Sequence, residues 1–253
     1  MKQTKRLNIV GLICNLLMLA AVACCFYFAA SSNSKFISVD TLKYYPVLGT
    51  IVSALGAFLM IWSNIVSISK KRDCTPRLFF TIRFLSAVMG TIALLGALAL
   101  MFGQNKFNPD VYNYETGALF FNFVVPGISI LQFIFFEIQP QAKFRKTFEP
   151  FIATLIYGCA ILITFIIINA GEGGAKAAHD FAPYFFFCIT PETAAFDKTE
   201  VWQNAVWLVG SLVISYIAAF VIWGLNRLFH TIFVGVEINS VPEEIGATEE
   251  SEI

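Results

Sequence analysis

Long apolar runs alternate with short polar links along most of the chain. A helix needs about 20 apolar residues to cross the hydrocarbon core of a bilayer, and six runs meet that length. They cover residues 8–30, 44–68, 79–102, 117–137, 148–169 and 202–228. The links hold most of the charges and turn-forming residues. The pattern predicts an all-α polytopic membrane protein, a six-transmembrane-helix bundle that forms one domain over residues 1–235.

The positive charges predict how this bundle is oriented. Twelve of the 17 Lys and Arg residues lie at the amino-terminal end, in the links 67–77 and 137–150, and at the carboxy-terminal end of the last run, counting the helix-end residues Arg83 and Arg227 with them. Cytoplasmic links of membrane proteins are enriched in these two residue types. We therefore expect a multi-pass protein of the cell membrane with both termini in the cytoplasm. Residues 236–253 are acidic and are expected to form a disordered cytoplasmic tail.

Composition supports the membrane assignment and excludes some partners. The chain is 57% hydrophobic and 13% charged, whereas soluble domains are roughly a quarter charged. Its formal net charge is zero, so nothing indicates nucleic acid as a partner, and no pattern identifies a protein partner. The six cysteines form no CxxC pair, and the two histidines, His179 and His230, lie in different segments. We predict neither a metal site nor a cofactor from this spacing.

A few polar residues interrupt the apolar runs. Arg83 lies about one turn into the third run, so we expect its side chain to reach back to the cytoplasmic interface. Glu137, at the end of the fourth run, is expected to be solvated. Asn15, Asn64 and Gln132 are expected to join helices through hydrogen bonds worth about 1 kcal/mol each. For each of them the alternative is a functional site, because polar groups in a membrane are costly.

The longest link, residues 170–201, contains the apolar segment "HDFAPYFFFCI" at 179–189. This segment is too short to span a bilayer. We expect it to lie at the outer interface, where Tyr184 and the neighbouring Phe side chains are favourable. It would act either as a plug over the bundle or as a lid over a lipid pocket.

Three short pieces of sequence carry a resemblance to a known family. They are "LKYYPVLGTIVSALGAFL" at 42–59, "LFFNFVVPGISILQFIFFE" at 119–137 and "APYFFF" at 182–187. They resemble the second span, the fourth span and the segment before the last span of the androgen-induced six-helix membrane proteins and their bacterial relatives. Animal members of that family are lipid-ester hydrolases, in which a Thr is the nucleophile and a His its base.

The two catalytic positions of that family carry other residues here. The Thr position falls on Pro46 and the His position on Asn122. Proline has no hydroxyl group, and an amide does not act as a base near neutral pH. Thr50 is one turn away, about 6 Å along a helix, and is too far to replace the missing hydroxyl. The resemblance therefore implies a protein without Thr/His catalysis.

Several residues are candidates for the lining of a retained lipid pocket open to the outer leaflet. Pro126 is expected to kink the fourth run and free a backbone carbonyl. The candidates are Pro46, Thr50, Asn122, Pro126, His179 and Tyr184. The leading hypothesis is a catalytically diverged relative of the lipid-ester hydrolases that binds membrane lipid or a lipid-like ligand. The alternatives are a small-molecule carrier subunit and a ligand-free accessory membrane protein.

Overall fold

Helices form every regular element in the described part of the computed structural model, which covers residues 2–32, 42–70, 74–103, 117–137 and 144–234. Five of them are long and apolar enough to cross a membrane. These are α1 (Lys2–Ser32), α2 (Tyr45–Lys70), α3 (Arg77–Gly103), α5 (Phe148–Ala170) and α8 (Val201–Phe229). The predicted all-α polytopic architecture is confirmed. The predicted tail at 236–253 lies outside the described residues.

The predicted fourth span is shorter than the other five. It comprises a π-helical turn, η2 (Phe120–Val124), and α4 (Val125–Phe136). Pro126 has no N–H to donate to the carbonyl of Asn122, and the wider π turn lies just upstream of it. A helix over Phe120–Phe136 is about 25 Å long, whereas the hydrocarbon core is about 30 Å thick. Its length alone does not make it a span.

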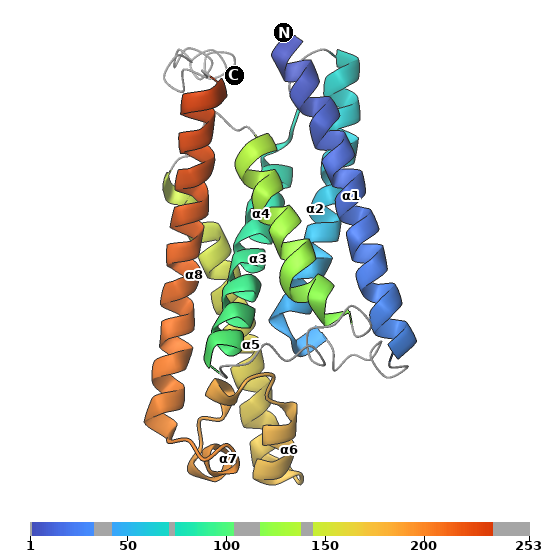
Figure 1. Ribbon diagram of the computed structural model, residues 1–253. Helices are drawn as coiled ribbons and strands as arrows, with labels where there is room; N and C mark the ends of the chain where they lie inside the picture. The colour runs from blue at the N-terminus through green and yellow to red at the C-terminus, as the bar shows by residue number, and fades with distance from the viewer. Residues whose placement is uncertain (1, 33–41, 71–73, 104–116, 138–143, 235–253) are drawn as a thin grey trace, which may run out of the picture.

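Successive helices of the bundle run antiparallel when the shorter α4 is included (Figure 1). The first helix, α1, starts at the end of the bundle where α8 and the short η5 (His230–Val234) finish. At the opposite end, three short helices follow α5 and form a compact cap. They are α6 (Gly174–Phe181), η4 (Phe185–Phe187) and α7 (Pro191–Phe196). A further short turn, η3 (Phe144–Thr147), precedes α5.

Small residues let α2, α3 and α4 pack closely. The hydroxyl of Ser86 on α3 is 2.7 Å from that of Ser53 on α2 and 2.6 Å from that of Ser129 on α4. A methyl group added at Gly90 would lie 3.1 Å from the Cα of Pro126. Such close approach is typical of helix pairs in membranes. These contacts fix the register of the three helices.

The predictions for Arg83 and Glu137 were wrong. Arg83 has no exposed surface and Glu137 only 4%, and the Arg83 Nε donates to the Glu137 Oε1 at 3.3 Å. The arginine turns inward because Gly56 on α2 leaves room for its stem; a Cβ there would lie 2.8 Å from the Arg83 Cδ. Asn226 on α8 donates to the backbone carbonyls of Phe133 and Glu137, at 2.7 and 2.8 Å, and holds the end of α4 in place.

Candidate functional site

The segments around Pro46 and Asn122 meet at the cap end of the bundle. Val47 and Phe121, the neighbours of these two residues, belong to one buried apolar cluster. The Asn122 side chain is half-buried and donates to the carbonyl of Ala118 in its own helix at 2.9 Å. Its amide is therefore bonded one turn back within its own helix. Pro46 is half-buried in the first turn of α2, where proline is tolerated.

Thr50 and Pro126 are buried within the bundle. Pro126 packs against Gly90 on α3 and contributes to the close approach of α3 and α4. Thr50 is 1% exposed, and its hydroxyl has no hydrogen-bond partner among the described residues. A buried hydroxyl without a partner is uncommon. Of the predicted pocket residues on the long helices, Thr50 alone offers an unused polar group.

Tyr184 connects the cap to the start of α2. Its hydroxyl accepts a hydrogen bond from the backbone N–H of Tyr45 at 3.3 Å, and Lys43 donates to the carbonyl of Asp180 at 3.1 Å. Burial raises the pKa of the Tyr184 phenol above its ordinary value. Tyr184 thus lies beside the Pro46 segment.

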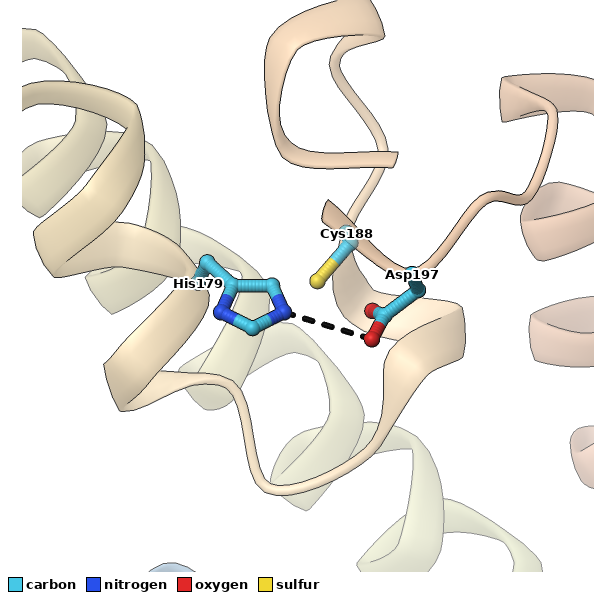
Figure 2. Close-up of side chains that lie close together, drawn as sticks. All are labelled: His179, Cys188 and Asp197. Carbon is cyan, nitrogen blue, oxygen red and sulfur yellow. Dashed lines mark hydrogen bonds and ion pairs between the residues drawn. The ribbon is translucent and has the colours of Figure 1, made fainter. Parts of the chain in front are cut away.

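His179 takes part in a different cluster, within the cap itself. The ligand atoms of His179 on α6, Cys188 just after η4 and Asp197 at the end of α7 all lie within 4.8 Å of one another (Figure 2). The His179 Nε2 is 3.3 Å from the Asp197 Oδ1. On the other side of the ring, Nδ1 is 3.6 Å from the Asp180 Oδ1.

Local structure holds the last two members of this cluster in place. Thr190 and Thr193 form a reciprocal capping box that starts α7, and the N–H of Asp197 closes the helix on the Ala194 carbonyl. Cys188 is buried in an apolar cluster with Phe165 of α5 and Ala178 of α6. Its carbonyl accepts a hydrogen bond from the Asn204 side chain at 2.7 Å. The cap is therefore tied to both α5 and α8.

The chemistry of the cluster favours a metal ion over acyl transfer. Burial and the adjacent Asp197 carboxylate raise the pKa of the Cys188 thiol to about 12, so the thiol is neutral near pH 7. A nucleophilic Cys requires a low pKa and a histidine as its proton acceptor. Here the Cys188 thiol and the His179 Nε2 both hydrogen-bond to the Asp197 carboxylate. Sulfur, imidazole and carboxylate ligands together are a set that Zn²⁺ uses.

Sequence reasoning identified His179 but missed Cys188 and Asp197. The three residues recur at intervals of nine, a spacing that matches no established zinc pattern. Only the folding of α6, η4 and α7 brings them together. The equal spacing was the one available signal, and it is weak. Comparisons of the chain with protein-family models, with curated proteins and with solved structures found no match.

Proposed function

We propose that this multi-pass membrane protein binds one transition-metal ion of the zinc class in a cap on its outer face. The observation that carries the proposal is the convergence of His179, Cys188 and Asp197 within 4.8 Å. Three side chains of these types leave a fourth coordination position for water or a substrate. The described residues offer no comparable group of ligand types elsewhere.

The location of the cap rests on a proposed topology. Six crossings, with the short α4 as the fourth, would place both termini in the cytoplasm of a cell-membrane protein. The alternation of helix directions and the common end shared by the start of α1 and the end of η5 support an even number of crossings (Figure 1). Most Lys and Arg residues lie in the sequence near the helix ends on that side of the bundle, where α1 starts and η5 finishes. The cap, at the opposite end, would then face the outside.

The cluster has the properties that a metal site needs. Cys188 would bind as a thiolate, so metal binding would release its proton to solvent. Asp180 lies on the far side of the His179 ring and would orient it, as carboxylates do for metal-bound histidines. The side chains of His179 and Asp197 are 29% and 31% exposed, so an ion could enter from solvent and exchange its fourth ligand. These features suit metal capture or metal-assisted hydrolysis.

Metal binding can be tested on the purified protein in detergent. Metal is removed with a chelator, Zn²⁺ or Co²⁺ is added back, and bound metal is counted by mass spectrometry after gel filtration. We expect about one ion per chain and a thiolate-to-cobalt absorption band with Co²⁺. Cys188→Ser should abolish the band, and His179→Ala or Asp197→Asn should weaken binding about tenfold or more.

Cys159→Ser is the matched control, because Cys159 is exposed on α5 and outside the cluster. This variant should keep both the stoichiometry and the absorption band. The proposal fails if the wild-type protein binds no Zn²⁺ and Co²⁺ gives no thiolate band. It also fails if Cys188→Ser binds metal as well as the wild type.

The relationship to the six-helix lipid-ester hydrolases remains a second proposal. It is favoured by the contact between the Pro46 and Asn122 segments and by the buried, unpartnered hydroxyl of Thr50 beside them. In this proposal the protein keeps a lipid pocket and lacks Thr/His catalysis. Purified wild-type protein should leave fatty-acid esters intact, and a lipid should copurify with it. Ester hydrolysis that survives Cys188→Ser and His179→Ala would contradict this proposal.

A further inference from the structure

A set of buried polar groups lies near the bundle end opposite the cap, around Arg83. The two terminal nitrogens of the Arg83 guanidinium have no hydrogen-bond partner among the described residues, although this side chain has no exposed surface. Only its Nε is paired, with the Glu137 carboxylate. A buried guanidinium normally has its donors satisfied, because an unmet hydrogen bond to a charged group is costly. These two terminal nitrogens, the fork of the guanidinium, are therefore free to bind a ligand.

The register of the helices places Gln132 at the same level of the bundle as Arg83. Ser53, Ser86 and Ser129 form one layer across α2, α3 and α4. The next layer lies three residues along each helix, away from the cap. It contains Gly56 on α2, Arg83 on α3 and Gln132 on α4. The contact between Gly56 and Arg83 confirms this register for α2 and α3.

The Gln132 side chain also lacks hydrogen-bond partners among the described residues. It is 2% exposed, and neither its amide nitrogen nor its amide oxygen has a partner among the described residues. The serines of the layer below bond to one another or to backbone, so they do not satisfy it. Arg83 and Gln132 together offer several N–H donors at one level of the bundle.

We propose that Arg83 and Gln132 bind the carboxylate of a small molecule or fatty acid inside the bundle. The planar fork of an arginine matches the two oxygens of a carboxylate, and the Gln132 amide can donate to the same group. Glu137 keeps Nε occupied and fixes the direction of the fork. The Ser53–Ser86–Ser129 layer closes the site on the cap side. This site is independent of the metal cluster in the cap.

Charge balance predicts that one proton accompanies the ligand. Arg83 and Glu137 carry opposite charges, so a second carboxylate beside them would add one buried negative charge. His230 is 4% exposed and lies beside the Glu137 backbone, and neither ring nitrogen has a satisfactory hydrogen bond within the described residues. Among the described residues, Cys14 of α1 also lies near the pair. His230 is placed to take up the proton.

Binding can be measured on the full chain in lipid nanodiscs, with oleate and succinate as the two probes. A response to oleate alone identifies a fatty acid, and a response to succinate identifies a soluble carboxylate. Affinity should rise as the pH is lowered, because protonated His230 balances the charge of the bound carboxylate. Gln132→Leu should fold normally and lower the affinity about tenfold or more, since it removes only the unpartnered amide.

The paired variant Arg83→Gln with Glu137→Gln removes both charges together and should abolish binding. Arg227→Gln is the matched control, because Arg227 is an exposed arginine near the same end, stacked on Trp223. It should bind like the wild type. The proposal is overturned if neither probe binds the wild type, or if Gln132→Leu and the paired variant both keep wild-type affinity.

Discussion

Removing Glu137 should destabilise the protein strongly, because it leaves Arg83 as an unpaired charge within the bundle. The two side chains are 0% and 5% exposed. Opposite charges about 4 Å apart attract by about 4 kcal/mol at an effective dielectric constant of about 20. In the intact pair, the cost of desolvating both charges offsets much of this attraction. When Glu137 is removed, Arg83 still carries its own desolvation cost and no longer has an attraction to offset it. We expect Glu137→Ala to cost about 3–5 kcal/mol.

A double-mutant cycle separates this effect from the loss of packing. The four proteins are wild type, Glu137→Ala, Arg83→Met and the double variant, and their thermal unfolding is followed in detergent. Glu137→Ala should lower the melting temperature by about 6–20 °C. The double variant should be more stable than the sum of the two single losses predicts, by about 2 kcal/mol, because no buried charge remains.

Glu149→Ala provides the control for removing a glutamate. Glu149 is half-buried in the first turn of α5 and accepts a hydrogen bond from Thr81. Removing a partly solvated carboxylate of this kind should lower the free energy of unfolding by about 1 kcal/mol or less. If the losses for Glu137→Ala and Arg83→Met are additive, or if Glu137→Ala costs no more than Glu149→Ala, then the buried ion pair does not contribute as argued.

Three further predictions concern other parts of the molecule. In the metal-free protein, the Cys188 pKa is raised from 9.0 to about 12, so its contribution to stability is present below pH 9 and lost as pH rises toward 12; Cys188→Ala should flatten that part of a pH–melting curve. Gly90→Val should cost about 1–3 kcal/mol, because the new side chain meets Pro126, and an unchanged melting temperature would contradict the close contact. In sealed cells, a cysteine at Lys176 should react with a membrane-impermeant maleimide and Cys74 should not; the reverse pattern would invert the proposed topology.

Sequence patterns predicted the long helices well because membrane spans are local features. Runs of about 20 apolar residues must satisfy their backbone groups within one helix, so the run itself specifies the structure. The fourth run is the exception, because Pro126 and the π turn at Phe120–Val124 interrupt a segment that is apolar throughout. Its apolar length was visible in the sequence, whereas its shorter helix was not.

The functional groups were harder to predict, because their meaning depends on neighbours distant in sequence. Arg83 lies close to a helix end, and that position alone predicts an interfacial anchor. Its inward orientation depends on the missing Cβ of Gly56 and on Glu137, 54 residues away. In the same way, the sequence does not show that the Asn122 amide bonds within its own helix.

The sequence by itself determined that this is an all-α, multi-pass membrane protein, because hydropathy and helix length are properties of single segments. It also determined which chemical groups are available, including the absence of a Thr/His pair at Pro46 and Asn122. Only the tertiary structure decided which groups meet. The cap assembles His179, Cys188 and Asp197 because three short helices fold back on α5 and α8. The bundle buries Arg83 with Glu137 because the register between helices sets the neighbours of each polar side chain. A local sequence pattern does not contain that register.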